Sequence, residues 1–173
     1  MDETEIDRVC RQDPYINRYY IGTFALDEIP RQLMPNTTFV VNLNQREDTS
    51  MGHWVIGSTL PFSPSSTLER SFFYFDSFAK PPPKSMKESI LSLSPKHVYY
   101  NDIVVQNPIS MSCGFVATYV LALLSRGYSP LDIVLKHFYD FVQHPFKNEA
   151  RIQPAITQLH SLKRRPILPS DQF

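Results

Sequence analysis

The sequence contains few cysteines, few glycines and no long apolar run, and each shortage excludes a class of protein. Two cysteines and five glycines in 173 residues leave no disulfide framework and no glycine-rich phosphate loop. No apolar run approaches the roughly 20 residues that a membrane-spanning helix needs. The first seven residues include four acidic side chains and no basic one, whereas a signal peptide begins with positive charge. We therefore expect a protein of a reducing compartment, cytoplasmic or nuclear, that is not secreted and makes no membrane contact.

The remaining composition suits one folded domain spanning residues 1–173. Hydrophobic residues make up 42% of the chain and aromatic residues 13%, which is enough for a core without disulfides. The 17 basic and 17 acidic side chains cancel, but unevenly along the chain: residues 1–50 carry 9 acids and 5 bases, whereas residues 111–173 carry 4 acids and 7 bases. A polyanion would therefore bind to the last third, although uneven charge alone implies no partner.

Hydrophobic periodicity and β-branched or aromatic runs predict an α+β fold, with a small mixed sheet packed against a buried central helix. Strands are predicted at Thr37–Leu43, His53–Thr59, Arg70–Asp76 and His97–Val105. Helices are predicted at Thr4–Gln12, Ser85–Ser92, Gly114–Ser125, Pro130–Gln143 and, more weakly, Gln153–Lys163. The helix over 114–125 is apolar nearly all round, which is typical of a buried helix.

Cys113 is the strongest candidate for chemistry, because it stands at the start of this most apolar helix. The positive end of a helix dipole favours a thiolate, and backbone N–H groups there can stabilise an oxyanion on a substrate carbonyl. Gly114, directly after it, leaves room for a substrate backbone. A cysteine beside an apolar helix can also pack simply as a small hydrophobe. From the residues alone that alternative stays open for Cys113, and it is favoured for Cys10.

A thiolate nucleophile needs a base, and His53 is the best placed of the five histidines. It begins an apolar strand, and Trp54 beside it can shield the ring from water. Asp76 closes an aromatic strand, where an unpaired carboxylate is costly, so we expect it to orient the His53 imidazole. Gln106 precedes Cys113 by seven residues at the end of a strand. Its side-chain amide can complete an oxyanion hole with the Cys113 backbone amide.

Other chemistries fit the sequence poorly. The chain has no H-x-x-x-H or C-x-x-C pair, so we expect no metal site. A papain-like order places the histidine roughly 130–150 residues after the cysteine, and only 60 residues follow Cys113. His137 and His144 lie on or just after a predicted surface helix, and we expect them to be solvated.

Several short segments spread over roughly residues 5–125 share one pattern. They are Y-Y-I-G-T-F at 19–24, V-V-N at 40–42, R-E at 46–47, G-H-W at 52–54, F-D-S-F at 75–78 and Q-N-P-I-S-M-S-C-G at 106–114. In these segments the sequence resembles the adenovirus-type cysteine endopeptidase, adenain, whose clan also holds the SUMO-deconjugating proteases. The Q-x-P-x-S-x-x-C-G and H-W elements are the most specific of them.

The resemblance implies an adenain-type cysteine protease fold with a His-Asp-Cys triad. Cys113 would be the nucleophile, His53 the general base and acid, and Asp76 the orienting acid, with Gln106 and the Cys113 amide as the oxyanion hole. The viral enzymes usually have glutamate where Asp76 stands, whereas SUMO proteases have aspartate. Trp54 is expected to narrow the substrate cleft and so favour glycine beside the scissile bond.

The function implied is a viral cysteine endopeptidase that cleaves capsid and core precursor proteins near glycine residues during virion maturation. We expect a monomer in the virion and in the host nucleus or a cytoplasmic virus factory. Two alternatives stay open: a deconjugating protease for a ubiquitin-like modifier, and a non-catalytic, DNA-associated virion protein.

Viral DNA and an activating peptide are cofactors of the family. Val98 stands about where the family has the cysteine that bonds the peptide, so a peptide is expected to bind non-covalently here. DNA would bind to the basic C-terminal third. The basic residues expected to take part are Lys136, Lys147, Arg151, Lys163, Arg164 and Arg165.

Overall fold

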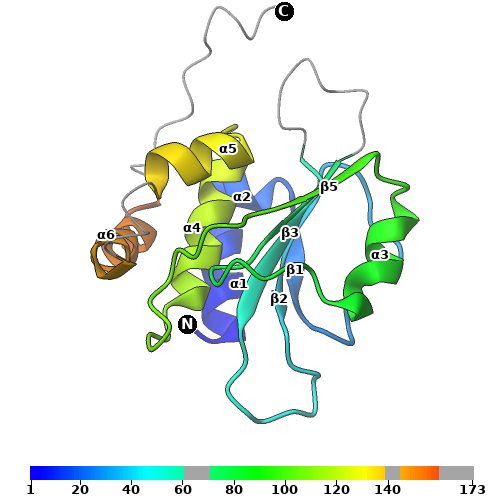
Figure 1. Cartoon of the computed structure of the whole chain (residues 1–173), viewed down its shortest axis with the longest axis horizontal. Helices are drawn as coiled ribbons and strands as arrows, with labels where there is room; N and C mark the ends of the chain where they lie inside the picture. The colour runs from blue at the N-terminus through cyan, green and yellow to red at the C-terminus, as the bar shows by residue number, and fades with distance from the viewer. Residues whose placement is uncertain (61–70, 139–144, 160–173) are drawn as a thin grey trace, which may run out of the picture.

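The computed structural model describes residues 1–60, 71–138 and 145–159. A five-stranded sheet lies between two layers of helices (Figure 1). Its strands stand side by side in chain order, β1 (Tyr20–Ala25), β2 (Thr38–Asn42), β3 (Trp54–Ser58), β4 (Ser71–Phe75) and β5 (His97–Tyr100). The outer pairs β1–β2 and β4–β5 are parallel, and the inner pairs are antiparallel. The α+β class with a mixed sheet, predicted from the sequence, is confirmed.

Helices cover both faces of the sheet (Figure 1). On one face lie α1 (Glu3–Gln12), α2 (Pro14–Asn17) and α4 (Cys113–Ser125), and on the other lies α3 (Lys87–Ser92), which a 3-10 turn, Lys84–Met86, precedes. Beyond α4 lie α5 (Pro130–Asp132), which continues into a π-helical turn at Ile133–His137, and α6 (Pro145–Thr157). None of the helices in the described residues is long and apolar enough to cross a bilayer.

The three inner strands, β2, β3 and β4, are buried on both faces because each face of the sheet packs against helices. Alternate side chains point to opposite sides, so consecutive residues of β4 enter different cores. Phe73 and Phe75 pack toward α1 and α4, whereas Phe72 and Tyr74 pack with Met86 beside α3. The site described below lies on the α4 side of the sheet.

A buried ion pair ties the N-terminal helices to α4. Asp13 caps α2 by accepting hydrogen bonds from the backbone N–H groups of Tyr15 and Ile16, both at 3.0 Å. The same carboxylate accepts from Arg126 Nη2 at 2.7 Å, and both side chains are almost fully buried. Arg126 also donates to the carbonyl of Leu159 at 2.8 Å. This pair therefore joins α2, the end of α4 and the residue two positions after α6.

The structure corrects several predicted boundaries. Residues 20–25 form strand β1, which the sequence analysis had not assigned. The strand predicted at His97–Val105 ends at Tyr100, because the Asn101 side chain takes over the pairing with the Asp76 backbone. The helix predicted at Pro130–Gln143 is an α-helical turn followed by a π-helical turn, and its expected end lies outside the described residues. The last helix begins at Pro145, earlier than predicted, since proline suits a first helical turn.

Candidate active site

Cys113 is the first residue of α4, as its place in the sequence predicted. The helix behind it is buried along nearly its whole length and packs against β3, so the position of the thiol is fixed by the core. The Cys113 residue is 9% exposed. A thiol at this end of a 13-residue helix lies in the positive field of the helix dipole.

His53 directly precedes β3 and faces Asp76. Its carbonyl accepts a hydrogen bond from the Leu43 N–H at 2.9 Å, which fixes the backbone at the entry to the strand. The Nε2 atom lies 2.7 Å from Asp76 Oδ1. The ring of Phe78 stacks on the imidazole, with 4.7 Å between centroids and an interplanar angle of 24°. The imidazole is therefore held by a carboxylate at its Nε2 edge and by an aromatic ring on one face.

Asp76 is fully buried and is fixed through its backbone as well as its side chain. Its Oδ1 also accepts from the Phe78 N–H at 2.7 Å. The Asn101 side-chain amide accepts from the Asp76 N–H at 2.9 Å and donates to the Asp76 carbonyl at 2.7 Å. Asn101 thus acts like one residue of a neighbouring strand, and it sets the direction in which the carboxylate points.

The pKa values of Cys113 and His53 are both shifted toward the charged form, a thiolate on Cys113 and an imidazolium on His53. Burial lowers the pKa of His53, but the bond to Asp76 and the interaction with Cys113 outweigh it and raise the pKa to about 9. Burial raises the pKa of Cys113, but His53 and the backbone N–H groups of Trp54 and Gly114 outweigh it, so this pKa lies below its ordinary value. A thiolate beside an imidazolium is the arrangement that activates a cysteine nucleophile.

Gln106 is buried and tied to the segments on both sides of the site. Its Oε1 accepts from the hydroxyl of Ser77 at 2.6 Å, and its Nε2 donates to the carbonyl of Ser110 at 2.8 Å. A carboxamide nitrogen carries two hydrogens, so the bond to Ser110 uses one of them. The side chain is thereby oriented by the residue after Asp76 and by a residue of the loop that leads to Cys113.

Trp54 and Gly114 pack against the N-terminal residue. The indole N–H of Trp54 donates to the carbonyl of Met1 at 3.2 Å. A Cβ at Gly114 would lie 3.0 Å from Met1 Cβ, 3.3 Å from Trp54 Cδ1 and 3.4 Å from Ile6 Cδ1. The space beside Gly114 is therefore taken up by the core, whereas the sequence analysis expected it to hold substrate backbone. What Gly114 offers the site is its backbone N–H, directed at the Cys113 sulfur.

A cleft of about 420 Å³ opens beside Cys113 and His53. Its lining also includes Trp54 and Phe78, so aromatic rings border it next to the histidine. The other lining residues are Met1, Asn42, Met51, Gly52, Pro108, Ser110 and Met111. The cleft has the size of a small-ligand site, and the Cys113 thiol and the His53 imidazole both line it.

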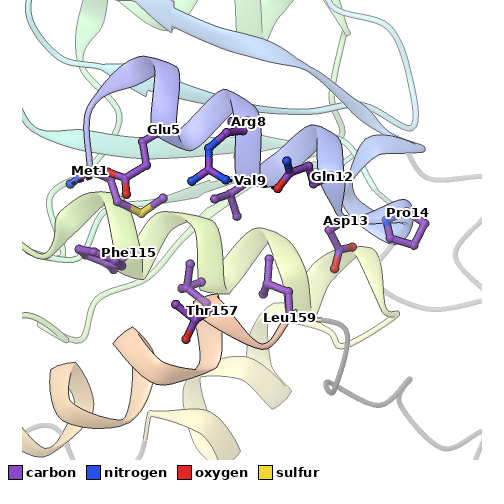
Figure 2. A pocket seen from close by; sticks show the side chains of 11 residues that line it. Met1, Glu5, Arg8, Val9, Gln12, Asp13, Pro14, Phe115, Thr157 and Leu159 are labelled. Carbon is purple, nitrogen blue, oxygen red and sulfur yellow. Dashed lines mark hydrogen bonds and ion pairs between the residues drawn. The ribbon is translucent and has the colours of Figure 1, made fainter.

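A second cavity, of about 340 Å³, is lined by residues of α1, α4 and the end of α6. Figure 2 shows Glu5, Arg8 and Gln12 of α1 above Phe115 of α4 and Thr157 near the end of α6. Its lining contains no cysteine or histidine. The cavity therefore offers none of the chemistry of the first cleft.

The other cysteine has the properties of a core residue. Cys10 is fully buried in α1, and burial, followed by the charges of Asp7 and Asp13, raises its pKa to about 12. Both cysteines are free thiols. In the described part of the chain, no group of three or more His, Cys, Asp or Glu side chains could hold a metal ion.

No family model matches the sequence, and no curated protein matches it. A solved structure does. The fold matches that of the ASFV pS273R protease, with a TM-score of 0.56 over 91% of this chain and 14% sequence identity. The chain spans 66% of the length of that protease, slightly under two thirds. At this identity the likeness shows the fold, which is therefore one that a protease uses.

The sequence analysis named His53, Asp76, Cys113 and Gln106 but missed the residues that hold them. Phe78 and Asn101 were not recognised as partners of the histidine and the aspartate. Asn42 was also missed: it lines the cleft, and its amide occupies the space that a Cβ of Gly52 would need. The one available signal was position, since Asn42 and Asn101 are polar residues at the ends of apolar strands.

Proposed function

We propose that this chain is a viral cysteine endopeptidase that cleaves capsid and core precursor proteins near glycine residues during virion maturation. The observation that carries the proposal is the alignment of Asp76, His53 and Cys113 beside a cleft, with the imidazole pKa raised and the thiol pKa lowered. A cysteine with a purely structural role needs no histidine–aspartate pair beside its thiol. The shared fold with a protease supports the same reading.

In this mechanism the Cys113 thiolate attacks the carbonyl carbon of the scissile peptide bond. The oxyanion that forms accepts hydrogen bonds from the Cys113 backbone N–H and the Gln106 side chain. The His53 imidazolium gives its proton to the departing amine, which leaves an acyl-enzyme thioester. Neutral His53 then takes a proton from water, whose oxygen attacks the thioester and releases the acid and the thiol. Asp76 keeps the proton-carrying Nε2 of His53 directed away from the sulfur.

The test compares the unaltered protein with Cys113→Ala on peptides and precursor proteins that contain glycine-rich sites. We expect cleavage by the unaltered protein and none by Cys113→Ala, because alanine cannot form the thioester. Cys10→Ala is the matched control and should cleave, since Cys10 lies in the core away from the cleft. Cleavage that persists in a folded Cys113→Ala protein would refute the proposal.

A deconjugating protease for a ubiquitin-like modifier remains the main alternative, because it would use the same triad and the same preference for glycine. The aspartate at position 76 favours it. The two functions are distinguished by incubating one enzyme preparation with modifier conjugates and with capsid precursors and measuring which of them it cleaves. A catalytically silent virion protein, the other alternative, would cleave neither substrate and would leave Cys113 no more reactive than an ordinary thiol.

Activation by a non-covalent peptide and by DNA belongs to the proposal. Val98, in the outermost strand β5, is 42% exposed. Its neighbours Tyr99 and Tyr100, but not Val98 itself, line an apolar cavity of about 440 Å³, which gives a peptide a place to bind. For DNA, the basic residues available in the described chain are fewer than the sequence suggested. Lys136 pairs with Asp132 at 2.6 Å, and Arg151 donates to the carbonyl of His137. Residues 163–165 lie outside the described residues.

We further propose that the protein acts as a monomer in the virion and in the host nucleus or a cytoplasmic virus factory. Cleavage rates measured with and without DNA, and with and without capsid-derived peptides, test the activators. Light scattering of the purified protein tests the monomer.

A further inference from the structure

A hydrogen-bond network joins α6 to the loop that precedes Cys113. Glu149 Oε1 accepts a hydrogen bond from the backbone N–H of Asn107 at 3.2 Å and a second, short one from the hydroxyl of Ser110. The N–H of Ser110 donates to the Asn107 carbonyl at 3.0 Å, which closes a turn between these two residues. A single carboxylate oxygen therefore holds both ends of the turn at 107–110.

Ser110 connects this turn to the reacting groups. Its carbonyl accepts the bond from Gln106 Nε2 at 2.8 Å. Its hydroxyl lies 2.8 Å from the hydroxyl of Ser112, which directly precedes Cys113 at the N-cap position of α4. The two groups assigned to the oxyanion hole, the Gln106 amide and the Cys113 backbone N–H, thus flank a loop whose shape depends on Ser110.

Apolar packing does little to hold this loop. The side chains of Ile109 and Met111 are 86% and 69% exposed, so neither anchors the loop in the core. By contrast, α6 is anchored, because Ile152 and Ile156 are buried in the cluster that α4 builds. The carboxylate on α6 is therefore a fixed point from which the polar network positions a loop that lacks hydrophobic support.

We propose that Glu149 is a positioning residue for the oxyanion hole. The inference rests on the proposed protease function and adds to it a residue that touches no reacting atom. Glu149 sets the distance between Gln106 and the Cys113 amide, which matters when negative charge develops on the substrate oxygen. It does not set the charge of the thiol, because His53 and the backbone N–H groups of Trp54 and Gly114 do so.

The test uses three variants at one position. Glu149→Ala removes the acceptor, Glu149→Asp withdraws it by one methylene, and Glu149→Gln keeps an oxygen at the same reach. We expect kcat to fall by about 10- to 100-fold in the alanine and aspartate variants with KM little changed, since small misplacements of catalytic groups cost this much. Glu149→Gln should retain most of the activity. Glu88→Ala, on an exposed position of α3, is the matched control.

A second readout separates positioning from general damage. Alkylation of Cys113 by iodoacetamide needs the thiolate but forms no oxyanion, so its rate should be the same in every folded variant. Thermal melts show which variants are folded. If Glu149→Ala does not fold, Glu149→Asp and Ser110→Ala decide the question, because each weakens the same network by less.

Three results would overturn the inference: full kcat in the alanine and aspartate variants, a glutamine variant as slow as alanine, or alkylation that slows in parallel with cleavage. Active Cys113→Ala protein, or an unaltered protein that cleaves nothing, would remove the proposed function and the inference with it. Normal cleavage through Cys113 combined with a fully active Glu149→Ala removes the inference alone.

Discussion

Replacing Asp76 with asparagine removes the negative charge beside His53 while keeping a side chain of nearly the same size. Asparagine Oδ1 can still accept from His53 Nε2 and from the Phe78 N–H, so the hydrogen bonds at 2.7 Å need not be lost. Burial lowers the pKa of the imidazole, and the Asp76 carboxylate, together with Cys113, raises it. Without the Asp76 charge, we expect the pKa of His53 to fall from about 9 toward its ordinary value of 6.5.

The expected change in the acylation rate follows from the fraction of His53 that is protonated. At pH 8, a group with a pKa of about 9 is about 90% protonated, whereas one with a pKa of 6.5 is about 3% protonated. In the proposed mechanism the imidazolium protonates the departing amine, so acylation at pH 8 should slow by up to about 30-fold in Asp76→Asn. The loss should shrink as the pH is lowered, to about twofold at pH 6.5, where a group with a pKa of 6.5 is half protonated.

Two measurements check this prediction. NMR titration of the His53 ring, assigned by comparison with His53→Gln, gives the pKa directly, and single-turnover kinetics from pH 6 to 10 give the acylation rate. Asp102→Asn, the same change at an exposed position, should leave both unchanged. If the pKa of His53 stays near 9 in a folded Asp76→Asn protein, then Asp76 is not what sustains the imidazolium, and the argument fails.

Two further predictions concern stability and reactivity. Arg126→Ala leaves Asp13 buried without its counter-ion, which should lower the free energy of unfolding by roughly 3–5 kcal/mol in urea titrations; a loss below about 1 kcal/mol would contradict the role given to this pair. At pH 7, iodoacetamide should label Cys113 quickly and Cys10 hardly at all, because the pKa of the first thiol is lowered and that of the second is about 12. Mass spectrometry of the labelled peptides checks this, and equal labelling in folded protein would refute it.

The parts of the fold that the sequence predicts are those with one dominant local cause. The helix at 114–125 was predicted because it is apolar on every side, and the structure buries it against both the sheet and α6. The strand at 71–75 is dense in aromatic residues and is buried on both faces. In such segments the preference of the residues and the demand of the core agree.

The predictions failed where a distant residue decides the outcome. The length of β5 depends on the Asn101 side chain, which replaces backbone pairing with Asp76. Likewise, the sequence gives no reason to link Glu149 with Asn107, because the two lie 42 positions apart and meet only when α6 packs on α4. His53, Asp76 and Cys113 stand next to or at the ends of strands and helices, and this position is what allowed the sequence to identify them. Gln106 was also predicted at a strand end, but it lies in the loop between β5 and α4. Their roles in catalysis stay predictions.

The placement of the thiol and its base on different layers has a consequence for folding. Cys113 stands on the helical layer, whereas His53 and Asp76 stand on the sheet. The pKa of Cys113 is therefore lowered only when the helical layer has packed against the sheet. Before that, Cys113 has the pKa and the low reactivity of an ordinary thiol. The lowered thiol pKa thus depends on the docked fold, and we expect oxidants to react slowly with Cys113 in a chain whose layers have not docked.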